Sequence, residues 1–330
     1  MVAQGLRLDM DVLYELPNEP LKCQSSVVTI GIFDGVHLGH QKIIAEVVKS
    51  ASKGETESVV MTFDPHPEEV ILSKSPPFLL PLDERIRLIE TMGVSRMIIS
   101  DFTRQIANIS AEEFVRDILV NNLRIKKICV GYDYSFGRDR AGGIELLREL
   151  GQRYGFETEV VPPVKINNEI VSSTKIRCCL AQGKIAQAND MLGRKHTIKV
   201  VVVHGDKRGR ILGYPTANCL CKDDILLPCV GVYAARVWID NMSPPVRGRG
   251  LKPYNAMANI GYCPTFRGEK LRFEVHLLDW KGDLYEKELM ITFIDRIRDE
   301  KGFDSVEELL GQLKEDEKMV RGMMGTVSVL

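Results

Sequence analysis

A single turn, residues 31–41, holds the residues of this chain best suited to chemistry. Two histidines and two glycines stand close together in it, in the order Gly-Ile-Phe-Asp-Gly-Val-His-Leu-Gly-His-Gln. The run 27–32 is rich in valine and isoleucine, as in a strand, and the apolar residues of 43–48 have helical spacing. A turn between a strand and a helix N-terminus gathers unpaired backbone N–H groups and the positive end of the helix dipole. We therefore expect a phosphate site there.

The histidines and glycines of this turn have distinct parts in such a site. Gly35 and Gly39 let the backbone approach an anion closely, because they carry no Cβ atom. His37 and His40 can donate hydrogen bonds to phosphate oxygens whose charge grows during an in-line displacement. Asp34 is open to two interpretations, a nucleotide contact or a cap on the turn.

Length and composition limit the function classes. At 330 residues the chain is long for one hydrophobic core, so two domains are expected. It has 44 basic and 45 acidic residues, so no overall field attracts nucleic acid or an anionic membrane. No apolar run reaches the ~20 residues of a membrane span, and residues 1–22 lack a secretory pattern. We expect a cytoplasmic protein with small-molecule partners, and the sequence leaves its oligomeric state open.

The eight cysteines are scattered along the chain, which favours reduced thiols over a disulfide framework. Cys219, Cys221, Cys229 and His204 lie close enough in sequence to raise the question of zinc. Zinc sites of this kind usually have a second cysteine pair, which this region lacks. Buried small side chains are therefore the favoured interpretation of these cysteines.

Residues 26–165 alternate between short apolar pieces and longer amphipathic ones. The strand-like pieces are 26–33, 58–63, 96–100, 127–131 and 158–164, and the helix-like pieces are 40–51, 83–92, 110–122 and 143–154. Ser110 and Glu113 have the spacing of a capping box. This order predicts a parallel sheet with helices on both faces. Ligands of such sheets bind beyond the carboxyl ends of the strands, where the histidine turn lies.

The pattern changes after Gly183. A short helical connector, 184–192, leads into strand-like segments at 198–204, 231–239, 255–260, 271–278 and 288–294. A clear helix returns only at 305–320, opened by the capping box of Ser305 and Glu308. We predict a small closed β-barrel with a terminal helix, and hence an α/β domain followed by a β domain. The expected domains are residues 1–185 and 186–330.

Further motifs follow the histidine turn. In the first half they are Thr-Phe-Asp-Pro-His-Pro at 62–67, Gly-Tyr-Asp-Tyr-Ser-Phe-Gly at 131–137 and Ser-Ser-Thr-Lys-Ile-Arg at 172–177. In the second half they are a glycine-rich segment at 204–218 that ends in Pro-Thr-Ala-Asn, Glu-Val-His-Leu-Leu-Asp at 274–279 and Arg-Asp-Glu at 298–300. In this order they resemble bacterial bifunctional riboflavin kinase/FAD synthetases, over about residues 25–320.

The resemblance implies that the first module is a Rossmann-like FMN adenylyltransferase, which transfers AMP from ATP to FMN and releases FAD and pyrophosphate. The implied catalytic residues are His37, His40 and Arg177, with Arg177 clamping the leaving phosphates. Gly31, Phe33, Asp34, Gly35, Gly39, Ser173 and Thr174 are implied as nucleotide-binding residues, and Asp133 as flavin-binding. Arg177 as a solvated helix residue and His66 as a purely structural one stay open.

The second module resembles a riboflavin kinase barrel, which transfers the γ-phosphoryl group of ATP to riboflavin and so makes FMN. A hydroxyl is a poor nucleophile, so a carboxylate has to accept its proton, and Glu274 is the implied base. Thr216 and Asn218 offer hard oxygens for Mg²⁺. The implied nucleotide-binding residues are Gly205, Lys207, Gly209, Arg210 and Gly213, and the implied flavin-binding residues are Arg298 and Glu300.

Some of these residues have a second interpretation. Glu274 as a structural strand residue stays open, and so does a solvated ion pair of Arg298 and Glu300. Leu309 and Leu313 are interpreted as packing residues of the last helix.

Departures from the family pattern are few. They are the stretch 194–200, Cys263, and Glu286 at a position where glycine is common, and they bear on flavin affinity. Two rival functions stay open: a chain with one active module, and a flavin-binding regulator without turnover. The regulator is the weaker rival, because a pure binder needs neither paired histidines nor an aligned carboxylate.

Overall fold

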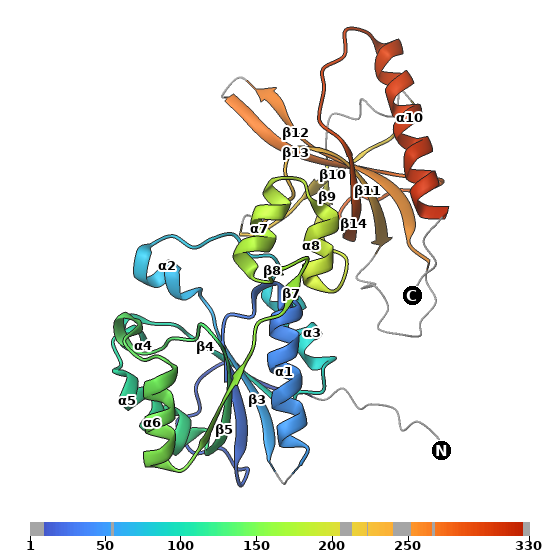
Figure 1. The fold of residues 1–330 in the computed structure, drawn as a ribbon. Helices are drawn as coiled ribbons and strands as arrows, with labels where there is room; N and C mark the ends of the chain where they lie inside the picture. The colour runs from blue at the N-terminus through green and yellow to red at the C-terminus, as the bar shows by residue number, and fades with distance from the viewer. Residues whose placement is uncertain are drawn as a thin grey trace, which may run out of the picture. The chain divides into compact units, whose positions relative to one another are not determined.

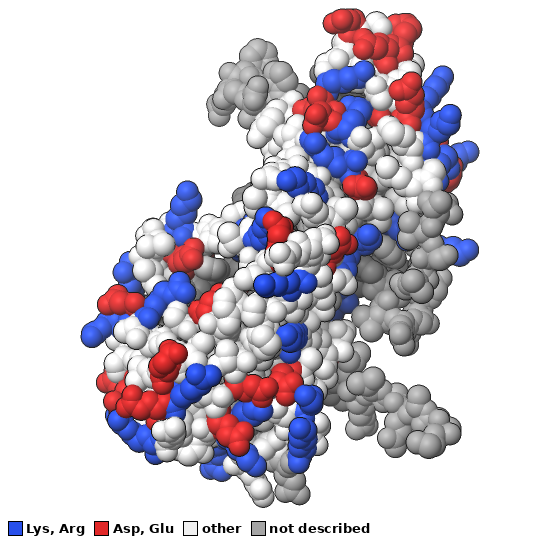
Figure 2. Space-filling view, in the orientation of Figure 1, with Lys and Arg blue, Asp and Glu red and all other residues white. Residues whose placement is uncertain are grey.

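The computed structural model describes residues 10–53, 56–204, 213–222, 224–239, 252–265 and 268–325 (Figure 1). The chain divides into two compact units, Met1–Ser173 and Thr174–Leu330. The division lies inside helix α7 (Ser173–Ala181), ahead of the boundary after residue 185 that we expected. On the face drawn in Figure 2, acidic and basic side chains are interspersed, in keeping with the formal net charge of −1.

The first unit is built on a parallel sheet, as predicted. Among the described residues its strand order is β1-β4-β3-β2-β5-β6. The strands are β1 (Asp11–Leu13), β2 (Ser26–Ile30), β3 (Glu57–Phe63), β4 (Arg96–Ser100), β5 (Ile125–Gly131) and β6 (Glu157–Val161). Because β3 and β5 flank β2 on opposite sides, the chain switches sides of the sheet next to β2. The crevice for a ligand is expected at that point.

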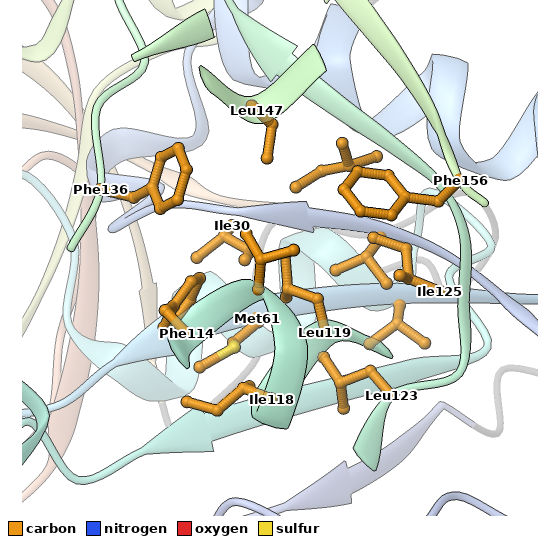
Figure 3. Close-up of a cluster of buried hydrophobic side chains, with 14 of the residues drawn as sticks. Ile30, Met61, Phe114, Ile118, Leu119, Leu123, Ile125, Phe136, Leu147 and Phe156 are labelled. Carbon is orange, nitrogen blue, oxygen red and sulfur yellow. The ribbon is translucent and has the colours of Figure 1, made fainter. Parts of the chain in front are cut away.

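Helices cover both faces of this sheet. On one face α1 (Leu38–Ala51) and α3 (Leu82–Glu90) bury Ile44 and Ile89 against β3 and β4. On the other, the π-helical η2 (Phe114–Asn122) and α6 (Ile144–Tyr154) pack Leu119 and Leu147 on β2 and β5 (Figure 3). Every residue of β2 is buried, which is characteristic of a parallel sheet covered on both sides.

The predicted capping box forms at the start of α5 (Ala111–Glu113), which runs into η2. Ser110 Oγ accepts a hydrogen bond from Glu113 N, and the Glu113 carboxylate accepts one from Ser110 N. The sequence pattern did not indicate the shorter elements, which in this unit are β1, η1 (Asp34–Val36), α2 (Pro67–Leu72), α4 (Arg104–Ala107), η3 (Arg138–Arg140), β7 (Lys165–Ile166) and β8 (Glu169–Ile170). In the second unit it did not indicate the strand Ala217–Leu220.

The second unit contains the predicted closed barrel. Its antiparallel strands follow the order β10-β13-β12-β11-β14-β9 among the described residues, and β9 pairs with β10 to close it. They are β9 (Thr197–Val203), β10 (Ala217–Leu220), β11 (Gly231–Ile239), β12 (Tyr254–Thr265), β13 (Gly268–Leu277) and β14 (Glu288–Arg298). The predicted connector forms α8 (Ile185–Leu192).

The predicted terminal helix is α10 (Val306–Gly325), and it packs on the barrel. Ser305 Oγ accepts a hydrogen bond from Glu308 N at 3.1 Å. The Glu308 carboxylate accepts from Asp304 N at 3.3 Å, one residue earlier than in a standard capping box. Val320 and Met324 lie in one apolar cluster with barrel residues, which holds the helix in place.

A buried polar contact joins α8 to the barrel. Asn189 Nδ2 donates to Phe293 O at 3.2 Å, and Asn189 Oδ1 accepts from His196 N at 2.6 Å. The His196 ring is 1 % exposed and stacks on Phe293. Burial lowers the pKa of His196 to about 3, and the charge of Arg194 adds to the effect.

The second unit should lose stability in mild acid through His196. The unfolded chain binds a proton there near pH 6.5, whereas the folded chain resists protonation down to about pH 3, so the free energy of unfolding falls as pH drops below about 6.5. Urea unfolding between pH 7 and pH 5, followed by the fluorescence of Trp238 and Trp280, should show a shallower pH dependence in His196→Leu. An unchanged slope in that variant would contradict the assignment.

Candidate functional sites

The histidine turn follows β2 directly and has an unusual backbone. Phe33, Gly35 and Val36 have positive φ angles of 51°, 77° and 39°. Glycine adopts such angles freely, but a β-branched residue such as Val36 does so rarely, at a cost of about 1–3 kcal/mol. Surrounding contacts must therefore hold this turn in shape.

Side chains from three other segments, together with Gln41 of the turn itself, bind the carbonyl groups of the turn. Arg85 Nη1 donates to Ile32 O at 2.8 Å, Thr62 Oγ1 to Ile32 O at 3.2 Å, Ser173 Oγ to Asp34 O at 2.9 Å, and Gln41 Nε2 to Val36 O at 2.8 Å. Arg85 is only 1 % exposed and lies over the Phe78 ring, with its guanidinium carbon 4.8 Å from the ring centroid. These bonds fix the direction in which the turn enters α1.

The side chain of Asp34 also anchors the turn. Asp34 is 2 % exposed, and its carboxylate accepts hydrogen bonds from Leu79 N at 2.9 and 3.1 Å and from Leu80 N at 3.3 Å. The carboxylate therefore joins the turn to a segment 45 residues further along the chain. Of the two interpretations of Asp34, the structure supplies direct contacts for an anchoring role.

His37 and His40 stand side by side at the start of α1. The His37 Nδ1 atom accepts a hydrogen bond from His40 N at 3.2 Å, so His37 is the N-cap and its neutral ring carries the proton on Nε2. The two rings stack with centroids 3.6 Å apart. A Cβ atom on Gly39 would lie 3.0 Å from His37 Cε1, which explains glycine at this position. The pair offers donors to an anion at the helix N-terminus.

Two further predicted residues, Asp133 and Ser173, lie near the same edge of the first unit. Asp133 follows β5, the strand next to β2, and a Cβ atom on Gly131 would lie 3.6 Å from Ile43 of α1. Ser173 begins α7 and binds Asp34 O, while Thr174 and Arg177 follow on that helix beyond the division between the units.

His66 has a structural contact in the described chain. Its Nδ1 atom caps α2 by accepting a hydrogen bond from Glu68 N at 3.1 Å. Its ring packs edge-on against Phe78, with centroids 5.7 Å apart.

The barrel unit has a cavity of about 320 Å³ that brings together five residues predicted for the second site. These are Thr216, Asn218, Glu274, Arg298 and Glu300. The strand register explains part of the convergence, because Asn218 of β10 lies opposite Glu274 of β13. Gly213 is described, with a φ of 80°, but does not line this cavity. Gly205, Lys207, Gly209 and Arg210 lie outside the described residues.

The two predicted flavin residues have different partners within this cavity. Glu300 accepts a hydrogen bond from Tyr262 N at 3.3 Å, and Arg298 binds Asp316 of α10. A Cβ atom at Gly261 would overlap the Glu300 carboxylate, so glycine is needed for Glu300 to reach its place. The alternative interpretation was a solvated ion pair between Arg298 and Glu300, but in the structure each of the two residues binds a different partner.

Sequence reasoning missed several residues of the cavity. His276 Nδ1 lies 2.7 Å from Pro215 O, so Nδ1 carries a proton there and ties β13 to the segment before Thr216. Its spacing of two residues from Glu274 places both on one face of the strand, a signal that was available. Leu309 and Leu313 line the cavity, and their interpretation as packing residues alone is incomplete.

A second cavity of about 430 Å³ lies beside the first. Thr216 lines both, and the wall of the second includes Trp280, Lys281 and Tyr285. Glu286, noted above as a departure from the expected pattern, has a φ of 63°, a conformation that favours glycine. The sequence departure at Glu286 therefore carries backbone strain next to this cavity.

The three cysteines considered above for a zinc site are free thiols in the structure. Cys219, Cys221 and Cys229 are free cysteines, and burial, followed by the charge of Glu274, raises the pKa of Cys219. The Cys219 thiol therefore stays protonated at neutral pH.

Comparisons with known proteins agree with this division into two sites. A family model described as FAD synthetase matches residues 20–175, and one described as riboflavin kinase matches residues 192–324. A bifunctional riboflavin kinase/FMN adenylyltransferase of Escherichia coli is 37% identical over 303 residues, 92% of this chain and 94% of the relative. The chain belongs to this bifunctional family. The family's function is flavin cofactor biosynthesis, by a riboflavin kinase and an FMN adenylyltransferase.

Other relatives cover the chain to a similar extent. The Listeria monocytogenes member of the bifunctional family is 35% identical, over 90% of this chain and 92% of the relative. A crystal structure described as a macrolide-efflux protein from Streptococcus pneumoniae matches with a TM-score of 0.84 and 35% identity, over 94% of this chain and 98% of that one. Within the described residues, no helix is both long and apolar enough to cross a membrane.

Loss of the Asp34 charge should loosen the turn. Asp34→Asn places an amide NH₂ where a carboxylate oxygen accepts Leu79 N, and leaving a buried donor unpaired costs about 1–3 kcal/mol. Hydrogen exchange at Leu79 and Leu80 should become faster, and the free energy of unfolding of the first unit should fall. The exposed Asp83, which accepts from Glu84 N, is the matched control: Asp83→Asn should change neither. Equal effects of the two substitutions would contradict an anchoring role.

Proposed function

We propose that the two reactions of the family take place at separate sites of this chain. Riboflavin is phosphorylated to FMN at the barrel cavity, and FMN is adenylylated to FAD at the histidine turn. The observation that carries this proposal is the convergence of a hydroxyl, an amide and a carboxylate, from Thr216, Asn218 and Glu274, in one cavity with an apolar wall. A flat ring system with a polar tail fits such a cavity.

In the kinase reaction, Glu274 accepts the proton of the riboflavin 5′-hydroxyl. The new bond forms between that oxygen and the γ-phosphorus, while the bond from the γ-phosphorus to the bridging oxygen of ADP breaks. The Glu274 carboxylate is partly buried, and Arg272 Nη1 lies 3.6 Å from it. We assign the riboflavin ring to the cavity wall of Phe303, Leu309 and Leu313, and the nucleotide to the second cavity, because Thr216 borders both.

Mg²⁺ fits the oxygen donors at this junction. Mg²⁺ usually keeps several waters and takes few protein ligands together with substrate phosphates, so a hydroxyl and an amide oxygen are a sufficient protein set. Thr216 and Asn218 would hold it, and it would neutralise the charge of the transferring phosphates. The described residues contain no cluster of three or more histidine, cysteine or acidic side chains for a metal, which suits Mg²⁺ shared with ATP better than a closed metal centre.

In the adenylyltransferase reaction, a phosphate oxygen of FMN attacks the α-phosphorus of ATP and pyrophosphate leaves. His37 and His40 donate hydrogen bonds to the oxygens that gain charge, supported by the N–H groups of the first turn of α1. Arg177 clamps the leaving phosphates, and Thr174 binds nucleotide next to Ser173. Asp133 contacts FMN. The stacked geometry of the two histidines supports their joint role.

We also propose a cytoplasmic location and small molecules as the working partners. The free cysteines among the described residues and the mixed surface charge support both statements.

One experiment tests the whole proposal. Purified full-length protein is incubated with riboflavin, ATP and Mg²⁺, and the flavins are separated by chromatography over time. FMN followed by FAD supports both sites. FMN alone rejects the adenylyltransferase site, and binding of riboflavin without turnover rejects the enzyme altogether.

His40→Ala should impair FAD formation and leave FMN formation unaffected. Loss of a donor that acts in the transition state costs roughly 10²–10³-fold or more, so FAD formation from supplied FMN should fall by that factor. FMN formation from riboflavin should stay at the wild-type rate, because it uses the other unit. If both activities disappeared in folded protein, the division into two sites would be wrong.

Glu274→Gln is the reciprocal variant. It keeps the size of the side chain but cannot accept the proton, so FMN formation should fall by roughly 10²–10⁴-fold. Supplied FMN should still be converted to FAD, which serves as the internal control for folding. Normal FMN formation by this variant would remove Glu274 as the base.

A further inference from the structure

Two arginine–aspartate pairs join α10 to the barrel, and they differ in their surroundings. Arg298 Nε binds the Asp316 oxygens at 3.0 and 3.1 Å, and its Nη2 binds Asp316 Oδ2 at 2.8 Å. Arg321 binds both oxygens of Asp279 at 2.8 Å. The first pair is buried, with Asp316 0% exposed, and both of its members line the riboflavin cavity. The second pair is on the surface, with the Asp279 side chain 72% exposed.

The buried pair fixes the plane of the Arg298 guanidinium. Gln312 Nε2 donates to Asp316 Oδ1 at 2.9 Å, which holds the carboxylate from the helix side. Arg298 Nη1 donates to Asp299 O at 2.9 Å, a third point that prevents rotation. Charge-assisted, two-point bonds of this kind are strong and directional away from water. Nη1 and Nη2 each carry a second N–H, and the guanidinium has a flat face suited to stacking.

The same cavity contains carboxylates that compete for this charge. Glu274 and Glu300 both line it, and Arg272 already lies close to Glu274. A guanidinium released from Asp316 would be attracted to either carboxylate, and pairing with Glu274 would make the base a poorer proton acceptor. Asp316 thus has two consequences at once, orientation of Arg298 and separation of its charge from Glu274.

We propose that Asp316 is a positioning residue for riboflavin, which acts by holding Arg298 against the cavity wall where the flavin ring binds. The inference rests on the proposed assignment of this cavity to riboflavin. Asp316 itself takes no part in phosphoryl transfer. Its effect should therefore appear in the KM for riboflavin and pass through Arg298.

A double-mutant cycle tests this dependence. The variants are Asp316→Asn, Arg298→Gln and the two combined, and the readouts are kcat and KM for riboflavin in FMN formation and the affinity for riboflavin alone, from quenching of flavin fluorescence. Each single substitution should raise KM and weaken binding roughly 10- to 100-fold, the usual loss for a hydrogen bond to a charged group, with kcat changed far less. The combined variant should be no weaker than Arg298→Gln, because the two residues act as one unit.

The surface pair gives a matched control. Asp279→Asn and Arg321→Gln remove the same type of bond from the same helix, and riboflavin KM and binding should stay at wild-type values. Asp316→Glu, which keeps the charge, should restore part of the affinity. If Asp316→Asn proves unstable, Gln312→Met removes only the helix-side bond and should raise KM several-fold.

Two results would overturn the inference. One is additivity of the two substitutions in the cycle, and the other is an unchanged riboflavin affinity with only a lowered melting temperature. Failure of the proposed function looks different, because the wild-type protein would then make no FMN. The fluorescence titration would still measure whether Asp316 acts through Arg298.

Discussion

A buried carboxylate that accepts backbone N–H groups is the constraint on which the first unit depends. Asp34 binds Leu79 N and Leu80 N from inside a turn whose φ angles are unfavourable for Phe33 and Val36. Each surrounding bond to a carbonyl of that turn offsets part of this strain. The strained backbone persists because hydrogen bonds from several segments hold it. As a result the rings of His37 and His40 are stacked, in a fixed orientation, at the start of α1. A phosphate site organised in this way needs little rearrangement when an anion binds.

The central strands and the long helices were predictable because their apolar period is regular over five or more residues. The parallel order of the first unit and the closed barrel of the second follow from that alternation, and both are confirmed. The shortest elements were not predictable, since a three-residue strand such as β1 contains too few residues to show a period. It forms because Asp11–Leu13 pairs in parallel with β4 and so becomes the edge strand of the sheet.

The candidate sites show a similar limit. Residues inside a dense motif, such as His37 or Glu274, were found because several unusual residue types coincide there. Asp316 and His276 were not predicted. Spacing from Glu274 placed His276 on the same face of the strand, but the contacts of both residues are with partners distant in sequence, Arg298 at eighteen residues and Pro215 at sixty-one. The motifs indicate candidate groups for the chemistry, whereas the contacts that hold Arg298 and the segment before Thr216 follow only from the packing of α10 and β13 in the barrel unit.

Thr216 borders both cavities of the barrel unit, which limits how far the fit of either ligand can change by substitution at this residue. Under the proposed assignment of riboflavin to the first cavity and of the nucleotide to the second, a substitution of Thr216 alters the fit of both ligands together. The opposite wall, contributed by Leu309 and Leu313 of α10, borders only the first cavity. Under the same assignment, acceptance of altered flavin rings can evolve through one face of the last helix, with Thr216, Asn218 and Glu274 left unchanged.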